Sequence, residues 1–303
     1  IAAVYPELWI NDGMVLSETM AIFMTAVALT AAYAFWQRPT TRNAVLLGLA
    51  CGFTALSRTE LVVLFPVVVI PLALMVKDAD WGRRFRHAVV ACLMAGVALG
   101  PWVIFNYTRF EEPTTMTTGT GSALSAASCD EVFYGTLIGY YANCFQGPWP
   151  SAALDESQRD LVPRHAAVQY TKDHLSRLPL VVAARVGRLW GLFKPGQTTA
   201  FDWWIEGRGR APTWIGLFMY YALLPFAVVG LVALRRRRVP ILPLLAIVII
   251  ATFAAAITFG VTRYRAPAEV VIVVAAGVGI DAAWRWFRSR SRTMAKRTAP
   301  VIE

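Results

Sequence analysis

The chain has 303 residues, of which 57% are hydrophobic and 16% charged, and its formal net charge is +10. Soluble domains are about 45–50% apolar and about 25% charged. Together with a mean hydropathy of +0.51, this composition excludes a disordered, collagen-like or coiled-coil chain and favours a protein embedded in a membrane.

The first residues indicate that the sequence is the C-terminal part of a longer protein. The chain begins with Ile1 rather than Met, and residues 1–6 resemble the end of an apolar helix. They contain neither the basic region nor the small-residue cleavage site of a signal peptide. We therefore expect further chain, and part of the chemistry, to precede Ile1.

Apolar segments of membrane-spanning length follow one another along the sequence. A spanning helix needs about 20 mostly apolar residues. The apolar segment 44–76 is too long for one crossing and is interrupted by the polar residues 57–60, so we expect two short spans there. The seven predicted spans are 14–35, 44–56, 61–76, 88–105, 213–234, 239–260 and 266–283.

Residues 106–212 contain no span, and we expect them to form a mixed, mainly helical domain. Within it, a polar helix is predicted from Asp155 to about Leu175. An apolar helix over 180–193 carries Arg185 and Arg188 three residues apart, and therefore on one face. We expect this helix to lie in the membrane interface. The alternative is a core helix of a soluble domain with snorkelling arginines.

The basic residues indicate the orientation in the membrane. The short connections 36–43, 77–87 and 235–238 and the tail after residue 284 contain 16 of the 29 Lys and Arg residues. Because cytoplasmic connections are enriched in Lys and Arg, these segments are predicted inside. The predicted organisation is therefore four spans in 1–105, an extracytoplasmic domain in 106–212, three spans in 213–284 and a basic cytoplasmic tail in 285–303. These basic runs are topology signals rather than nucleic-acid sites, and the tail is expected to contact anionic lipid headgroups.

The four cysteines divide into two kinds. Cys51 and Cys92 lie in predicted spans and are expected to be inert apolar residues. Cys129 and Cys144 lie in the extracytoplasmic segment, where paired thiols oxidise, so we expect a disulfide between them. Metal binding is the weaker interpretation, because no His or further Cys lies at ligand spacing, and we expect no metal.

Ionisable residues gather at the predicted outer ends of the spans. Charges near membrane spans are costly and are usually paired or functional. A group of arginines suits a phosphate or pyrophosphate, and nearby carboxylates suit the orientation of arginines or of sugar hydroxyls. If residues 263–265 are extended, two guanidinium groups face one anion. The alternative is ordinary snorkelling or ion pairing. The residues concerned are Asn11, Asp12, Glu18, Arg58, Glu60, Asp202, Arg263 and Arg265.

Several short motifs in a fixed order carry a family resemblance. They are LSET at 16–19, ALSRTE at 55–60, PWVIFNY at 101–107 before a Thr/Gly-rich stretch at 114–121, CDEVFYG at 129–135 before Cys144, RVGRLWGLFKP at 185–195 and RYRAP at 263–267. Together they resemble the GT-C superfamily of integral-membrane glycosyltransferases. The most similar branch is glycosyltransferase family 39, with its protein mannosyltransferases and aminoarabinose transferases. The segments around Cys129 and Trp190 are most similar to actinobacterial members.

The resemblance implies a multi-pass plasma-membrane enzyme that transfers a sugar from a polyprenyl-phosphate donor to an acceptor outside the cytoplasm, without a nucleotide-sugar donor. The family's catalytic carboxylate lies in the first extracytoplasmic loop, so we expect it upstream of Ile1 and assign no catalytic residue. Some members use a divalent metal; we expect no cofactor here.

Roles for this chain's residues follow from the same resemblance. Arg58, Arg263 and Arg265 would bind the lipid phosphate, and the extracytoplasmic segment would select an acceptor, either protein or glycan. The residues expected to position the phosphate are Arg185 and Arg188, and those expected to orient the arginines are Glu18 and Glu60.

Two other classes of function fit a polytopic chain. One is a transporter or flippase for a lipid-linked molecule, and the other is a non-catalytic scaffold. Transporters bury charges near the bilayer midplane and contain internal repeats. Here the charges lie at span ends, and the sequence shows no repeat.

Overall fold

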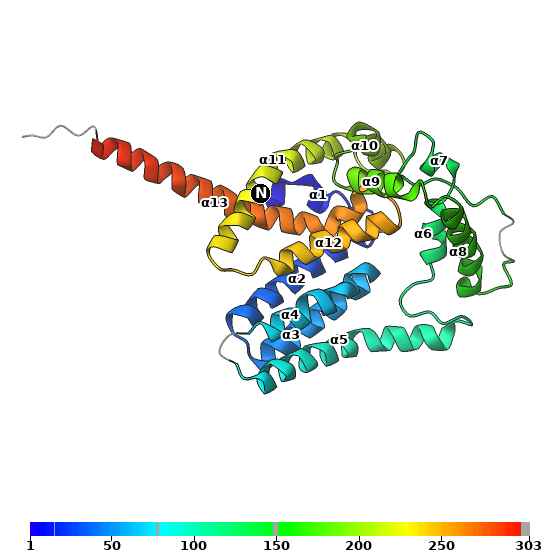
Figure 1. The fold of residues 1–303 in the computed structure, drawn as a ribbon, viewed down its shortest axis with the longest axis horizontal. Helices are drawn as coiled ribbons and strands as arrows, with labels where there is room; N and C mark the ends of the chain where they lie inside the picture. Colours follow the sequence, from blue (N-terminus) through cyan, green and yellow to red (C-terminus); the bar gives the residue numbers. More distant parts are fainter. Residues whose placement is uncertain (15, 77–78, 148–150, 298–303) are drawn as a thin grey trace, which may run out of the picture.

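The computed structural model describes residues 1–14, 16–76, 79–147 and 151–297, with side chains to residue 289. Over these ranges the chain forms helices and no strands, which confirms the all-helical part of the expected fold. The longest helices lie side by side in one bundle (Figure 1). They are α2 (Glu18–Gln37), α3 (Thr41–Ser57), α5 (Trp81–Arg109), α11 (Arg210–Arg236), α12 (Leu242–Ile257) and α13 (Ala266–Arg297).

Four of the described helical segments are long and apolar enough to cross a membrane. They are α2, α5, α11 and the segment Thr262–Ser289, which includes most of α13. Thr59–Leu74 and Leu242–Ile257 are apolar but shorter. The protein is therefore a helical membrane protein, and length and composition alone account for four of the seven expected spans.

The break inside the apolar segment 44–76 lies where the sequence places it. Helix α3 ends at Ser57, and Arg58 has extended backbone angles. The chain continues as a 3-10 helix η2 (Thr59–Val63), a π-helical turn η3 (Phe65–Val69) and α4 (Ile70–Leu74). Pro66 and Pro71 stand in the first turns of η3 and α4. Since proline lacks an N–H group, each interrupts the regular α-helical ladder.

Close contact between α11 and α13 depends on glycine. A Cβ atom at Gly230 would lie 1.8 Å from the carbonyl oxygen of Ala275, and one at Gly279 would lie 1.9 Å from that of Phe226. The two backbones therefore approach as closely as the absence of side chains allows. Small residues at helix crossings are typical of membrane bundles, in which packing replaces the hydrophobic effect as the force between helices.

The described part of 106–212 consists of helices joined by turns and loops and contains no strand, which agrees with the mainly helical character expected of this segment. The predicted polar helix is α8, where the Asp155 side chain and Gln158 form a capping box. The helices of this segment are α6 (Thr120–Ala126), α7 (Asp130–Phe133), α8 (Glu156–Asp173), α9 (Leu178–Leu189) and α10 (Pro195–Trp204).

The predicted apolar helix is α9, and it is shorter than expected. It ends at Leu189, and Gly191 then adopts a left-handed conformation with φ of 67°. Helix α9 packs against α12 and the 3-10 helix η4 (Thr262–Arg265). Both of its arginines are buried. The arginines therefore do not snorkel, because snorkelling keeps the charged head in water. The packing of α9 against α12 agrees with the core-helix part of that alternative.

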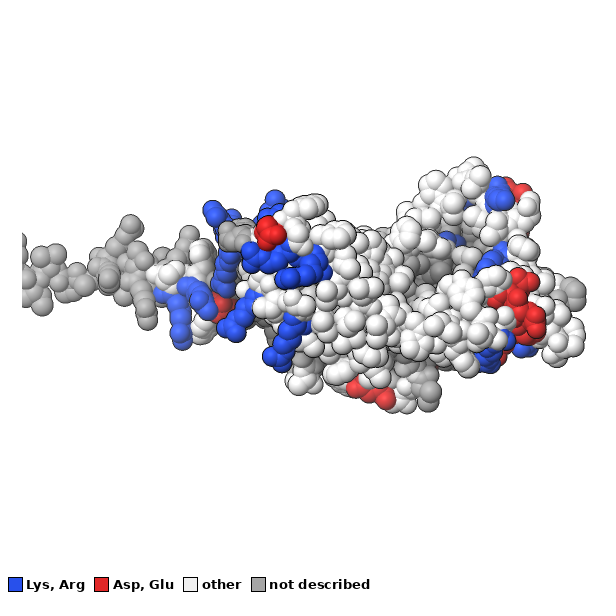
Figure 2. All heavy atoms as spheres, turned by 90° about the horizontal axis from the view of Figure 1, so that it is seen from below, with Lys and Arg blue, Asp and Glu red and all other residues white. Residues whose placement is uncertain are grey.

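Charge is distributed unevenly along the bundle. Figure 2 shows Lys and Arg gathered toward the end at which α13 projects, further charges at the opposite end, and a largely uncharged surface between them. The last turn of α11 contributes Arg235 and Arg236 to the basic end. In the expected basic tail, residues 298–303 and the side chains from 290 onward lie outside the described part. The uncharged surface is the part suited to a hydrocarbon environment.

Candidate charge cluster and apolar groove

Charged residues from four parts of the chain meet at one end of the bundle. They come from the start of α2, the break between α3 and η2, the end of α10 with the turn that follows it, and η4. Three of the arginines and four of the carboxylates in this region are linked by ion pairs or hydrogen bonds, directly or through Thr262. We call this set the charge cluster; its members are Glu18, Arg58, Glu60, Asp202, Glu206, Arg208 and Arg263.

Glu18 is the centre of the cluster. Its Oε1 atom lies 2.8 Å from Nε of Arg263 and 3.3 Å from Nη1 of Arg58, and its side chain is only 1% exposed. Arg58 also places Nε 2.6 Å from Oε1 of Glu60, with its guanidinium 4.8 Å from the ring centre of Tyr264. One buried carboxylate thus holds two arginines that are 205 residues apart in sequence.

A second arm of the cluster runs through Thr262. The Thr262 hydroxyl donates to Oδ2 of Asp202 at 2.8 Å and accepts from Nη1 of Arg208 at 3.1 Å. Glu206 lies 3.8 Å from Nη2 of Arg208 and 3.4 Å from Nε of Arg263, which joins the two arms. Burial is the main cause that raises the pKa of Asp202 to about 7, against the lowering effect of Arg208. Asp202 therefore changes its charge near neutral pH.

The cluster retains unused hydrogen-bonding capacity. Among the described residues, Oε2 of Glu18, Oδ1 of Asp202 and Nε of Arg208 are buried and have no hydrogen-bond partner. Most buried polar atoms in proteins are satisfied. Their concentration in one cluster marks it as a place where a polar ligand gains hydrogen bonds.

Glu206 and Arg208 are members that the sequence reasoning missed. They belong to no motif. Their only signal is position, because they lie between Asp202 and the apolar helix α11 and so at the same predicted membrane face. Asn11 and Asp12, which the sequence placed at this face, are not in the cluster. The Asp12 carboxylate instead accepts a hydrogen bond from Thr19 at 2.8 Å.

Arg265 does not join Arg263 in the charge cluster. Residues 262–265 form a 3-10 helix, whereas the shared orientation required an extended chain. At about 120° per residue, positions two apart diverge. Arg265 is fully buried, pairs with Glu269 and donates from Nη1 to the carbonyl of Leu189 at 3.1 Å. The expected pair of guanidinium groups facing one anion is therefore wrong.

The surroundings of Arg265 form a separate inner network. Its guanidinium carbon lies 3.8 Å from the ring centre of Tyr220, and Nη2 lies 4.0 Å from Oε1 of Glu7. The Tyr5 hydroxyl donates to Oε2 of Glu269 at 2.6 Å. Arg265 thus ties the first residues of the chain to α11 and α13.

Arg185 and Arg188 belong to the framework beneath the site. Arg185 donates to the carbonyls of Ala256 and Ile257 at 3.1 and 3.2 Å, and so caps the C-terminus of α12. Arg188 donates to the carbonyl of Ile138 at 2.7 Å and to the side chains of Gln197 and Thr198. Through these contacts the two arginines hold residues 106–212 together and do not join the charge cluster.

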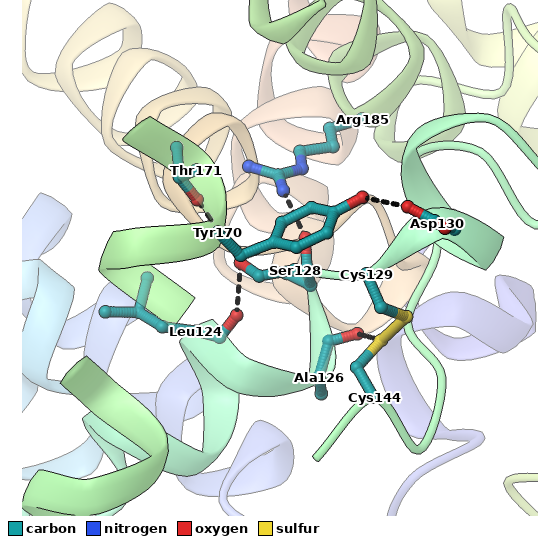
Figure 3. The surroundings of a disulfide bond; sticks show 10 residues. Leu124, Ala126, Ser128, Cys129, Asp130, Cys144, Tyr170, Thr171 and Arg185 are labelled. Atoms are coloured by element: carbon teal, nitrogen blue, oxygen red, sulfur yellow. Dashed lines mark hydrogen bonds between the residues drawn. A yellow bond between two sulfur atoms is a disulfide. The ribbon is translucent and has the colours of Figure 1, made fainter. Parts of the chain in front are cut away.

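The expected cysteine pair lies beside this framework. Cys129 and Cys144 are joined in a disulfide, and Arg185 donates to the carbonyl of the nearby Ala127 at 2.7 Å (Figure 3). Cys51 is buried and Cys92 exposed, both as free thiols. Among the described residues, no group of three or more His, Cys, Asp or Glu side chains is arranged to hold a metal ion.

An apolar groove of about 510 Å³ leads to the charge cluster. Its walls are η2, η3 and α12, and Ile249 and Phe253 in its lining are 60% and 61% exposed. Glu60 and Tyr264 also line it, and both contact Arg58. The groove and the cluster are therefore continuous.

Comparison of the chain with protein-family models, with curated proteins and with solved structures finds no match. The chemistry that the site supports therefore follows from its geometry. An apolar groove that borders a cluster of guanidinium and carboxylate groups suits an amphiphile with a long hydrocarbon chain and a polar, anionic head.

Proposed function

We propose that this protein is a membrane glycosyltransferase that moves a sugar from a polyprenyl-phosphate donor to an acceptor outside the cytoplasm. The observation that carries the proposal is the continuity between the apolar groove and the charge cluster. A polyprenyl phosphate has the same two parts, a long hydrocarbon chain and a charged head. The sequence motifs that resemble glycosyltransferase family 39 support the same substrate class.

The groove supplies the apolar half of this recognition. Its exposed lining residues lie on α12 and on the η2–η3 segment, both of which are apolar helical segments of the bundle. In a bilayer such a groove opens to the hydrocarbon region, so an isoprenoid chain enters it from the membrane. Burial of apolar surface contributes about 25 cal/mol for each Å².

Arg263 supplies the polar half. Its side chain is 33% exposed, the most accessible of the arginines in the charge cluster. Glu18 and Glu206 both contact its Nε atom. Within the described structure its two terminal nitrogens form no hydrogen bond, so they remain available to a phosphate. Donors aimed at the phosphate stabilise it as the leaving group when the sugar–phosphate bond breaks.

The proposal includes the full topology expected from the sequence. Besides the four long helices, α3, the segment Thr59–Leu74 and α12 would each cross the plasma membrane as short spans. At 1.5 Å per residue their 16 or 17 residues extend about 25 Å, close to the bilayer core of about 30 Å. Seven crossings place residues 106–212 and the charge cluster outside, and the basic tail inside.

A sugar-transfer assay with a matched pair of variants tests this function. The full-length protein is reconstituted in proteoliposomes with a radiolabelled polyprenyl-phosphate sugar and a membrane extract as the source of acceptors. Because Lys keeps the charge of Arg263 but loses its fork, Arg263→Lys is expected to lower kcat/KM about tenfold to a hundredfold. Arg210→Lys, at the exposed start of α11, is the control and should retain wild-type transfer.

The same preparation separates the alternatives. A flippase moves the intact lipid-linked sugar to the opposite leaflet and forms no new glycoside, whereas a scaffold does neither. Equal kcat/KM for wild type and Arg263→Lys removes Arg263 from the donor site. Absence of any labelled product, with translocation observed, overturns the glycosyltransferase proposal in favour of a flippase.

A further inference from the structure

A second pocket, distinct in chemistry from the apolar groove, lies against the same break in the bundle. Its volume is about 500 Å³, and it lies between the chain that follows α5 and the helix α8. We call it the threonine pocket because six threonines line it: Thr59, Thr114, Thr115, Thr117, Thr118 and Thr120. Neither the expected phosphate site nor the apolar groove uses these hydroxyl groups, with the exception of Thr59.

One wall of the threonine pocket is a strap, residues 110–119, held by the end of α5. Trp102 donates from Nε1 to the carbonyl of Met116 at 3.0 Å, and Asn106 donates from Nδ2 to the carbonyl of Thr115 at 3.0 Å. Asn106 is 1% exposed. These two hydrogen bonds hold the backbone of the strap in place at Thr115 and Met116. The threonine side chains of the strap therefore extend from a fixed backbone.

The opposite wall is α8. Backbone N–H groups of the strap and of α6 donate hydrogen bonds to side chains of α8. The backbone N–H of Glu112 donates to Oγ of Ser157 at 3.1 Å. Asp160 accepts from the N–H groups of Gly121 and Ser122 at 2.7 and 3.1 Å. A Cβ at Gly121 would lie 2.0 Å from the Asp160 carbonyl oxygen, so only glycine fits there. The threonine pocket is thus a built cavity rather than a gap between loose segments.

The lining determines what the pocket can bind. A threonine hydroxyl both donates and accepts hydrogen bonds, as each hydroxyl of a sugar does. Thr115 and Thr118 form no side-chain hydrogen bond with described residues. The charged members are Asp160 and Arg164, paired at 3.0 Å, and Glu112, which forms no ion pair in the described structure. With one arginine against two carboxylates, the charged lining disfavours an anion, and the hydroxyl groups suit a neutral ligand with many hydroxyls of its own.

We propose that the threonine pocket binds a neutral carbohydrate, the glycan acceptor of the transfer reaction. Thr59 shows that the threonine pocket lies next to the proposed donor site. This residue lines both the threonine pocket and the apolar groove, and it lies between Arg58 and Glu60 of the charge cluster. A sugar in the pocket would therefore lie next to a lipid-linked donor in the groove. The acceptor role rests on the proposed function, whereas carbohydrate binding does not.

Direct binding without any donor tests the inference. Saturation-transfer NMR on the full chain in nanodiscs uses a panel of methyl hexopyranosides and methyl pentofuranosides as probes. The double variant Thr115→Val/Thr118→Val keeps the shape of the pocket and removes two hydroxyls, so the dissociation constant of the bound glycosides should rise about tenfold or more. Thr108→Val, on the exposed surface of α5 outside the pocket, is the matched control and should bind as wild type does.

The remaining outcomes are decisive as well. Glu112→Gln removes the unpaired charge and should leave the dissociation constant of a neutral glycoside within about threefold. Loss of glycoside binding in Glu112→Gln with retention in the double threonine variant would show that the carboxylate and not the threonine hydroxyls holds the sugar, and would overturn the assignment of the threonines. Absence of saturation transfer from every glycoside overturns the inference. Glycoside binding without transfer from polyprenyl-phosphate sugar by the full-length protein leaves the carbohydrate site standing and rejects the proposed enzyme.

Discussion

At the scale of single residues, buried charged side chains of this protein contact more than one partner. Glu18 accepts from two arginines, and Arg265 is surrounded by Glu7, Glu269 and the ring of Tyr220. An isolated buried ion is very costly, and a well-bonded network offsets that cost. The sequence identified most members of the charge cluster because charged residues stand out at the ends of apolar segments.

The sequence could not assign each of these residues to its network. Arg263 and Arg265 are two residues apart, yet one belongs to the charge cluster and the other to the inner network. The 3-10 geometry of η4 directs the two side chains to different networks. No residue type in 262–265 predicts a 3-10 helix in preference to an extended chain. Arg185 and Arg188 were likewise recognised as arginines on one face, but the carbonyl groups that they bind come from distant segments.

Asp202 provides a pH-dependent prediction. Burial raises its pKa from the ordinary 3.8 to about 7. Between these values the folded protein holds a proton that the unfolded chain has released, so this residue makes the free energy of unfolding fall as pH rises from about 4 to 7. Asp202→Asn removes that contribution. Thermal unfolding of wild type and variant across this pH range should show a difference in Tm that grows with pH in favour of the variant.

The control for this measurement is Asp173→Asn, on the exposed surface of α8. It makes the same chemical change outside the charge cluster, so it shows how much of the effect is common to any Asp→Asn change. Parallel pH profiles for wild type and Asp202→Asn would show that folding does not change the pKa of Asp202 and would contradict the raised pKa.

At the scale of elements, local rules predicted helix ends better than helix contacts. The polar residues 57–60 predicted the end of α3, and Asp155 predicted the start of α8, because a break in apolar pattern and a capping residue are both local signals. The end of the predicted apolar helix at 193 was wrong by four residues, since α9 ends at Leu189. Its packing against α12 required knowledge of the tertiary fold, because the apolar face alone fits a membrane interface equally well.

The contact between α11 and α13 gives a prediction at this scale. A methyl group at Gly279 would overlap the carbonyl oxygen of Phe226, so Gly279→Ala must push the helices apart. We expect the free energy of unfolding to fall by about 1–3 kcal/mol, the usual cost of overpacking. Gly277, two residues earlier in α13, has nothing within 4 Å of its Cβ position. Gly277→Ala should leave stability unchanged or raise it by up to about 1 kcal/mol through helix propensity.

Chemical unfolding in detergent, followed by tryptophan fluorescence, measures both glycine variants under one condition. The informative quantity is the difference between them, because both change glycine to alanine in one helix. Equal stability of Gly279→Ala and Gly277→Ala would show that the two backbones are not in close contact.

At the scale of the whole molecule, the arrangement of charge agrees with a membrane protein whose two ends face different compartments. Basic residues gather at the end where α13 projects, and the disulfide lies in the segment at the other end (Figures 1 and 2). Composition alone predicted the helical membrane class. The number of crossings is harder to obtain, because η2, η3 and α4 divide one apolar segment into pieces shorter than a standard span.

Cysteine accessibility tests the proposed seven-span topology. With the two free thiols removed as Cys51→Ala and Cys92→Ala, single cysteines are introduced by Ala152→Cys, in the segment before α8, and by Arg237→Cys, at the end of α11. Seven crossings put these positions on opposite sides, because the Arg-rich connection stays in the cytoplasm. An impermeant maleimide should label Ala152→Cys in intact cells, and Arg237→Cys only after permeabilisation. Labelling of Arg237→Cys in intact cells would reverse the orientation, and would place the charge cluster on the side where a lipid-linked donor for extracytoplasmic transfer is absent.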